Sequence, residues 1–300
     1  MVICAVVPDL LLRTCPICGL DNRSQPVHPY SEPPWDLKQC TGCGLLYLEN
    51  APAYQKLETE FAWEKTWAEE ARKRLRREPV LYYAGRALQA IPKRLFRRDK
   101  LMSWVRRYFA PGQILDVGCA GGNTLLQLPD RYVPFGIEVS RELADMARAR
   151  FSARGGDVIQ GNAISALPRL PADSFSGVLM TSYLEHEVDP RTVLEQVARI
   201  MRPGAGAIIK VPNFACWNRR VRGTCWCGFR YPDHVNYFTP ALLDRLLRGS
   251  GLRVLRFAVW DRFPFSDNMW LVAESSFDAS RAWSDRDSRI EPCPQPQVTN

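Results

Sequence analysis

The chain has 300 residues, of which 46% are hydrophobic and 24% are charged, and this is the balance of a folded globular protein rather than a disordered one. No run approaches the roughly 18 consecutive apolar residues that a membrane-spanning helix needs, so the sequence predicts no such helix. The net charge of +8 has one source, because residues 72–107 contain thirteen Arg and Lys residues against two acidic ones. Any anionic partner is therefore expected at that segment.

The N-terminal region predicts a small metal module over residues 1–50. The first seven residues are apolar, but no basic residue precedes them and Pro8-Asp9 follows at once, so they make a poor secretion signal. Ten cysteines without an export signal favour metal binding in a reducing cytoplasm over disulfides.

Four of these cysteines form two C-x-x-C pairs, at Cys15, Cys18, Cys40 and Cys43. Two such pairs at this separation suit a tetrahedral zinc ion held by four thiolates, and the alternative is four free thiols. Because four thiolates leave no open coordination position, the zinc is expected to be structural rather than catalytic.

Residues 51–110 are predicted to be a basic helical segment. Apolar residues recur there at loosely helical spacing, and Pro79, Pro92 and Pro111 divide the region into two or three helices. One interpretation is a solvated helical surface. The other is a dock for an anionic partner, namely a membrane surface, a lipid-linked substrate or RNA.

Residues 111–275 alternate short apolar strands with helical stretches, which predicts a Rossmann-like, mostly parallel α/β sheet. The expected strands are 113–117, 135–138, 157–160, 175–181, 207–211, 253–260 and 268–273. The expected helices are 122–128, 141–151, 191–201 and 240–247. The last two strands have no helix between them, so they should pair antiparallel at one edge. Residues 276–300 are predicted to be a disordered tail.

The most informative segment is the strand ending in Asp116-Val117, followed by a small-residue turn with Gly118, Ala120 and Gly122. Small residues allow the backbone to approach a nucleotide closely, and Glu138, at the end of the next strand, can accept both ribose hydroxyl protons. NAD and S-adenosylmethionine both fit such a site. An acid at Asp116 would repel a pyrophosphate but suits the ammonium group of S-adenosylmethionine, so electrostatics favours the methyl donor over a dehydrogenase.

At this point residues 100–275 resemble the class I S-adenosylmethionine-dependent methyltransferases. The glycine-rich turn matches the first motif of that family and Glu138 matches its ribose-binding acid. Asn162-Ala163 matches the adenine-binding turn, where the family usually has Asp in place of Asn162. The resemblance implies a seven-stranded sheet and a set of donor-binding residues. This set is Asp116, Gly118, Ala120, Gly122, Glu138, Asn162, Ala163 and Thr181.

Residues 175–186 resemble the fourth motif of the subgroup around ubiquinone-biosynthesis O-methyltransferase, and residues 201–204 look like the turn before that family's fifth strand. The cysteine pairs and residues 226–240 look like a bacterial group of zinc-bearing methyltransferases linked to sugar, polysaccharide, lipid or secondary-metabolite pathways. These resemblances imply a small-molecule, glycan or lipid-linked acceptor.

The candidate catalytic residues are His186, His234 and Glu185. Imidazole is the natural base near neutral pH, and a base helps when the methyl acceptor is a hydroxyl. The alternative for each histidine is a structural hydrogen bond. Glu185 would orient a histidine or, as the resemblance to the ubiquinone enzymes permits, bind a divalent cation together with His186.

The sequence therefore predicts a cytoplasmic enzyme that moves a methyl group from S-adenosylmethionine to oxygen or carbon, with membrane contact through residues 72–107 as an open alternative. An RNA methyltransferase is a second hypothesis. Residues 181–184 lack the Asn/Asp-Pro-Pro-aromatic run typical of enzymes that methylate base amines, but this leaves ribose methylation open. A non-catalytic zinc-containing binding protein on the same fold is a third.

Overall fold

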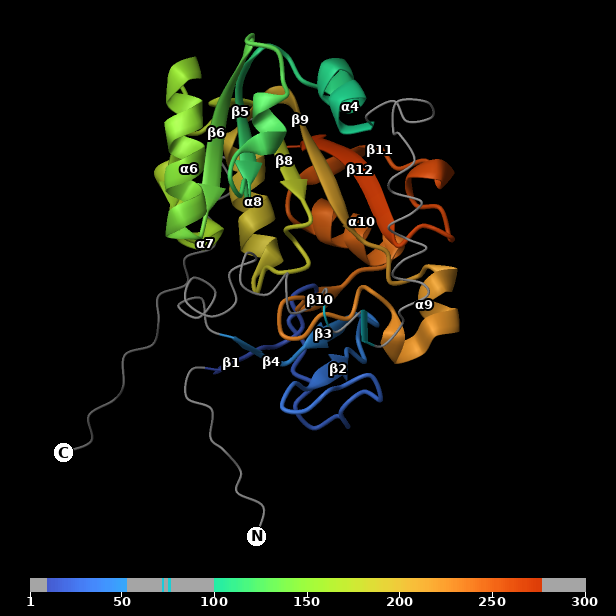
Figure 1. The fold of residues 1–300 in the computed structure, drawn as a ribbon. Coiled ribbons are helices and arrows are strands. Elements are labelled where there is room, and N and C mark those ends of the chain that lie inside the picture. Colours follow the sequence, from blue (N-terminus) through green and yellow to red (C-terminus); the bar gives the residue numbers. More distant parts are fainter. Residues whose placement is uncertain (1–9, 53–71, 73–74, 77–99, 277–300) are drawn as a thin grey trace, which may run out of the picture.

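A seven-stranded sheet forms the centre of the computed structural model, which describes residues 10–52, 72, 75–76 and 100–276 (Figure 1). The strand order is β11-β12-β9-β8-β5-β6-β7. The strands are β5 (Gly112–Val117), β6 (Tyr132–Glu138), β7 (Asp157–Gln160), β8 (Phe175–Thr181), β9 (Met201–Pro212), β11 (Leu252–Arg256) and β12 (Asn268–Ser275). No helix of the described part of the chain is both long and apolar enough to cross a membrane.

The strand directions confirm the predicted sheet. Strands β6, β5, β8 and β9 pair parallel, as do β6 and β7, whereas β12 runs antiparallel to both β9 and β11. Several predicted boundaries differ by a few residues, and in two places the type of element differs. The strand expected to reach residue 260 ends at Arg256, because the Asp261 carboxylate accepts a hydrogen bond from the Ala258 amide and closes a 3-10 turn at Val259–Asp261. The turn expected at 201–204 belongs to β9, with Gly204 at a φ of 75°.

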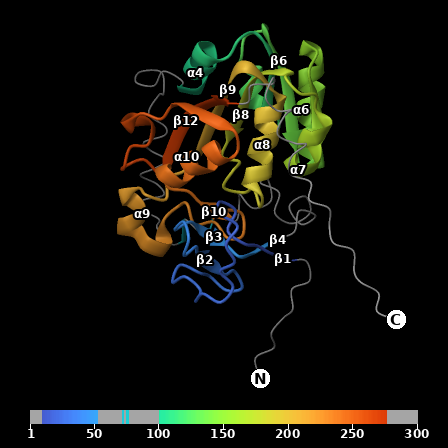
Figure 2. The same ribbon diagram turned by 180° about the vertical axis from the view of Figure 1, so that it is seen from behind.

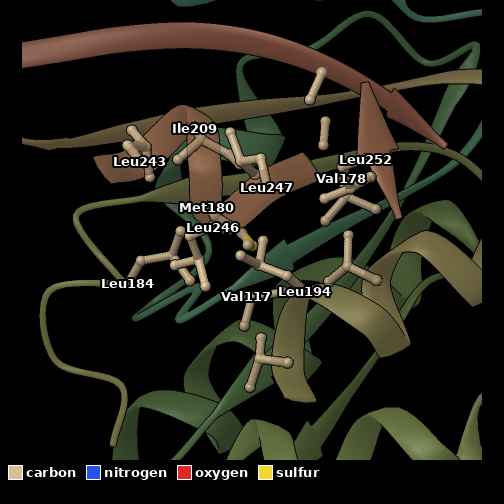
Figure 3. Close-up of a cluster of buried hydrophobic side chains, with 14 of the residues drawn as sticks. Val117, Val178, Met180, Leu184, Leu194, Ile209, Leu243, Leu246, Leu247 and Leu252 are labelled. Carbon is tan, nitrogen blue, oxygen red and sulfur yellow. The ribbon is translucent and has the colours of Figure 1, made fainter. Parts of the chain in front are cut away.

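Successive residues of each central strand enter different cores, because side chains alternate across a sheet. Leu115, Val178 and Ile209 belong to the core beneath α7 (Ala163–Ala166), α8 (Pro190–Ile200) and α10 (Pro240–Gly249), part of which Figure 3 shows. Their neighbours Ile114, Leu179 and Ile208 belong to the core beneath α4 (Lys100–Tyr108), α5 (Asn123–Leu126) and α6 (Arg141–Phe151). Helices therefore cover both faces of the sheet, and the reverse view shows the same arrangement (Figure 2).

The N-terminal module shares a sheet with the C-terminal half of the chain. Strands β2 (Leu37–Gln39) and β3 (Leu46–Leu48) form a three-stranded antiparallel sheet with β10 (Asn236–Tyr237). Strands β1 (Leu10–Leu12) and β4 (Asn50–Pro52) pair beside it. The predicted domain division stays a prediction, but residues on either side of the gap at 53–99 pack into common cores.

Parts of the predicted organisation lie outside the described residues. These are most of the basic segment expected over 51–110 and the tail from residue 277 onward. The described end of the basic segment is helix α4, which packs Trp104 and Val105 against the sheet. Short helix α9 (Trp217–Arg222), which the sequence analysis did not predict, follows β9.

Candidate active site

One cavity of about 540 Å³ lies at the carboxyl ends of β5, β6 and β8, the place where open α/β sheets bind nucleotides. It brings together nearly all the residues that the sequence predicted for donor and acceptor. Those on its lining are Asp116, Gly118, Ala120, Glu138, Asn162, Ala163, Thr181, Glu185, His186 and His234.

Gly122 is the exception among the predicted donor-binding residues, because it does not line the cavity. It has a φ of 81°, and a Cβ there would lie 2.6 Å from the Phe151 ring. Its absence of a side chain thus allows the start of α5 to pack on α6.

Asp116 presents an uncompensated carboxylate to the cavity. The residue is 2% exposed and its Oδ1 atom has no hydrogen-bond partner. Burial, followed by the nearby charge of Glu138, raises the pKa of Asp116 well above its usual range. A cationic ligand group would offset both effects, which is the property expected of an ammonium-binding acid.

Glu138 is held in one orientation by the backbone. Its Oε2 accepts from the Ala120 amide at 2.8 Å and its Oε1 accepts from the Ser140 amide at 2.9 Å. Each carboxylate oxygen has a second lone pair, so this geometry leaves the carboxylate able to accept from two adjacent hydroxyl groups. The turn that supplies the Ala120 amide has φ values of 77° at Gly118 and 47° at Ala120.

Asn162 also has a structural role that the sequence analysis did not predict. Its Oδ1 accepts from the Ser165 amide at 2.9 Å and caps helix α7. The expected contact between this oxygen and an adenine amino group stays a prediction and would use the remaining lone pair.

Glu185, His186 and His234 meet in the half of the cavity where a methyl acceptor is expected, called the acceptor half below. Each has a ligand atom within 4.8 Å of the others. The two imidazole rings are 4.7 Å apart between centroids and nearly perpendicular. His186 Nδ1 lies 2.9 Å from the Asp233 carbonyl oxygen, and His234 Nδ1 lies 2.8 Å from that of Gly228. Because a carbonyl can only accept, Nδ1 of each neutral ring carries the proton and Nε2 keeps its lone pair.

The charges of this cluster are set by burial. Burial, with a smaller contribution from Arg230, lowers the pKa of His186 to about 4. Burial, followed by His186 and then Arg230, places the pKa of His234 well below its usual value. Burial raises the pKa of Glu185 to about 8, and its Oε2 has no hydrogen-bond partner. At pH 7 the two rings are neutral and Glu185 is mostly protonated. The three groups are therefore available either for proton transfer or for a divalent cation.

Two residues of the acceptor half carry charges that the sequence analysis did not single out. Arg230 lines the cavity and donates from Nη2 to Asp233 Oδ2 at 3.0 Å. Both lie in the irregular segment before β10, which the sequence analysis considered only as part of the resemblance over residues 226–240.

The N-terminal module is tied to the acceptor wall by Arg13, which is 6% exposed. Its Nη1 donates to the carbonyl oxygens of Leu48 and Val235, both at 3.1 Å. Its Nη2 donates to the Val188 carbonyl and to Asn236 Oδ1, both at 2.8 Å. One guanidinium thus joins β3 to the chain beside His234 and to the loop after β8.

The same wall continues to Glu185 through the backbone. The Val235 and Asn236 amides donate to the Glu185 carbonyl at 2.7 and 3.1 Å. The Asn236 side-chain amide donates to the carbonyls of Leu184 and Glu187. The backbone segments that contain Glu185 and His234 are therefore hydrogen-bonded to each other and to the N-terminal module.

The four predicted cysteines converge, with sulfur atoms within 4.8 Å of one another. The Sγ atoms of Cys15 and Cys43 are 3.5 Å apart, and those of Cys18 and Cys40 are 3.4 Å apart. A tetrahedral ion with about 2.3 Å bonds to sulfur separates its ligands by roughly 3.8 Å, so the quartet matches a zinc site in size and donor type.

Residues 93–256 match a protein family described as "Methyltransferase domain". Relatives of this chain include "O-methyltransferase cnsE" of Penicillium expansum, 32% identical over 52% of this chain and 59% of that protein. They also include "Ubiquinone biosynthesis O-methyltransferase" of Aeromonas salmonicida, 29% identical over 47% of this chain and 63% of that protein. The chain thus spans about three-fifths of the length of these curated relatives.

Similar solved structures include an S-adenosylmethionine-dependent methyltransferase from Clostridium acetobutylicum. It is 12% identical, has a TM-score of 0.48, and covers 66% of this chain and 100% of its own. Another, from Archaeoglobus fulgidus, is 16% identical with a TM-score of 0.45, and covers 60% of this chain and 95% of its own.

Proposed function

We propose that this chain, which belongs to the family of methyltransferase domains, moves a methyl group from S-adenosylmethionine to a hydroxyl of a small-molecule, sugar or lipid-linked acceptor. One observation carries the proposal. A single cavity holds an uncompensated Asp116 and a backbone-oriented Glu138 at one end, and two neutral imidazoles at the other. The two relatives named O-methyltransferases support oxygen over carbon as the acceptor atom.

The donor half fits the two polar ends of S-adenosylmethionine. Asp116 would receive the ammonium group, and Glu138 would accept from the two ribose hydroxyls. The sulfonium is already activated, so the protein mainly aligns donor and acceptor and excludes water.

In the acceptor half, Nε2 of His186 or His234 takes the proton of the acceptor hydroxyl as its oxygen attacks the methyl carbon. The carbon–sulfur bond breaks and its electron pair stays on sulfur, so the neutral thioether leaves. A ring with a depressed pKa is unprotonated at neutral pH, so its Nε2 lone pair is available, and burial at the same time makes the ring a weaker base. Removing the base typically slows such a reaction by about 10² to 10⁴-fold.

Glu185, His186 and His234 also form a donor set that fits a divalent cation, because two imidazole nitrogens and a carboxylate oxygen lie within 4.8 Å. Such an ion would favour the ionised form of Glu185 and lower the pKa of a bound hydroxyl. Each Nδ1 already donates to a carbonyl, the usual support for an imidazole ligand.

We further propose that Cys15, Cys18, Cys40 and Cys43 hold a structural zinc ion. The support is the convergence of the four sulfurs, whose number and spacing suit a tetrahedral ion. Contact of residues 72–107 with an anionic membrane surface stays a proposal on charge alone, with RNA as the alternative.

Transfer of a radiolabelled methyl group to a panel of phenols, sugars and catechols tests the proposed reaction. We expect turnover with at least one hydroxyl acceptor, and a loss of about 10²-fold or more in His186→Ala or His234→Ala. A chelator added in a parallel assay tests whether the cluster of Glu185, His186 and His234 acts as a base alone or binds a divalent cation. Loss of turnover that added Mg²⁺ restores supports the cation, because Mg²⁺ does not replace a thiolate-bound zinc ion. Loss that only Zn²⁺ restores reports on the cysteine site instead, and full activity in chelator supports the base alone.

A further inference from the structure

Two segments distant in sequence form one apolar surface beside the cavity. They are helix α9 and the turn that follows β11, which Figures 1 and 2 place along the same side of the molecule. The Trp217 amide donates to the Pro264 carbonyl at 2.7 Å, and the Trp217 and Phe265 rings lie 4.6 Å apart. Phe263 extends the row, with ring centroids 5.3 Å from Phe265 and 5.5 Å from Trp260.

The side chains of this surface are unusually exposed for their size. The exposed fractions are 86% for Val221, 78% for Trp260, 62% for Val259, 62% for Phe265 and 50% for Trp217. Large apolar side chains that stay in contact with water are unfavourable in free energy. A cluster of such exposed side chains marks an interaction site. Trp217 and Val221 are four residues apart on α9, so they share one helical face.

The charge around these residues is of one sign. Arg220 and Arg262 are exposed, and residues 213–226 contain no Asp or Glu. The one acid within residues 256–266, Asp261, is 3% exposed and pairs with Lys100 and Arg256.

The next acid along the chain does not oppose this charge. Asp267 turns toward the cavity, where it accepts from the side chains of Asn218 and Trp226. The surface is thus apolar and cationic, without a facing carboxylate in these two segments.

We propose that this surface, formed by Trp217, Val221, Val259, Trp260, Phe263 and Phe265 and flanked by arginines, docks on an anionic phospholipid bilayer. Exposed Trp and Phe next to arginine suit the boundary between acyl chains and headgroups, where rings insert and guanidinium groups meet phosphates.

The placement has a consequence for access to the site. Asp267 and Asn268, directly after the turn, and Cys227 and Gly228, shortly after α9, line the cavity. Docking by this surface would set the cavity next to the bilayer, so that an amphiphilic acceptor could enter it from the membrane. Only this consequence rests on the proposed methyl transfer; the docking itself does not.

Flotation with vesicles tests the proposal on the full chain. We expect binding to phosphatidylcholine vesicles containing about one-third phosphatidylglycerol, much weaker binding to pure phosphatidylcholine, and weakening by salt. The double variant Trp260→Ser/Phe265→Ser should bind at least about tenfold more weakly, as should Arg220→Glu/Arg262→Glu.

Matched controls lie elsewhere on the molecule. Leu12→Ser removes an apolar side chain that is 63% exposed on β1, and Arg245→Glu reverses an exposed charge on α10. Both should leave vesicle binding unchanged.

Absence of vesicle binding, or binding that persists in both double variants, overturns the proposal. So does a concentration-dependent dimer that Trp260→Ser/Phe265→Ser abolishes, because the surface would then bind a second copy. Titration with S-adenosylmethionine in the same variants reports on the donor site separately, so failure of the two proposals is distinguishable.

Discussion

Replacing Arg13 by methionine tests whether the N-terminal module supports the acceptor wall. The guanidinium donates four hydrogen bonds of 2.8 to 3.1 Å from a site that is 6% exposed. Methionine replaces the aliphatic part of arginine but ends before the guanidinium and donates nothing, so buried oxygens of Val188 and Asn236 lose a charged donor. A hydrogen bond to a charged group contributes about 1.5 to 3 kcal/mol, and the four share one side chain. We therefore expect a loss of about 3 to 5 kcal/mol of unfolding free energy.

The Arg13→Met substitution should also lower the rate of methyl transfer. Asn236 and Val235 donate to the Glu185 carbonyl, and His234 immediately precedes them. Loosening this segment should lower kcat/KM for the methyl acceptor, by about tenfold or more if the Nε2 position shifts by about 1 Å. The Kd for S-adenosylmethionine should change little, because Asp116 and Glu138 sit on β5 and β6.

Three assays on the Arg13→Met variant test these expectations. Urea unfolding gives the unfolding free energy, calorimetry gives the Kd for S-adenosylmethionine, and steady-state kinetics gives kcat/KM for the acceptor. Arg23→Met is the control, because Arg23 pairs with Asp21 at the surface with 68% of its side chain exposed. That control should keep the urea midpoint of the parent. Arg13→Met protein with parental stability and parental acceptor kinetics would refute the reasoning.

Three further outcomes are expected. Binding of S-adenosylmethionine should tighten as pH rises and should release a proton, because the raised pKa of Asp116 keeps its carboxyl partly protonated until an ammonium group arrives. Calorimetry in buffers of different ionisation enthalpy measures the proton release, and Asp116→Asn should abolish that release. Chelation should remove about one zinc ion per chain and lower the melting temperature, and Cys43→Ser should purify without metal; parental stability in that variant would count against a structural ion. Gly122→Ala should lower the unfolding free energy by about 2 to 4 kcal/mol, because its Cβ would clash with the Phe151 ring. Gly204→Ala, at a similar φ but with open space around it, should cost only about 1 kcal/mol. Thermal unfolding measures both losses, and equal losses would contradict the packing role of Gly122.

The elements that the sequence predicted well depend on local signals. Helix α6 begins after Ser140, whose hydroxyl caps it, and its predicted bounds are correct. The buried strand β8 was predicted from its apolar residues, Phe175 and the run Val178–Met180. The meeting of Asp116 with Glu138 followed from topology alone, because parallel strands end at the same edge of a sheet.

The elements that the sequence did not predict depend on contacts between distant residues. Two-residue strand β10 exists because β3 pairs with it across nearly 190 positions, and no local pattern predicts so short a strand. No local pattern marks Arg13, since its burial depends on three carbonyls from separate segments. The early end of β11 depends on the buried Asp261 carboxylate, which pairs with Lys100.

Calorimetric titration of S-adenosylmethionine into the purified chain tests the central claim most directly, with Glu138→Ala and Glu138→Gln as matched variants. The account predicts micromolar binding, on the order of −8 kcal/mol, that weakens by at least about tenfold in both variants. Folded protein that binds neither S-adenosylmethionine nor its demethylated product would contradict the account.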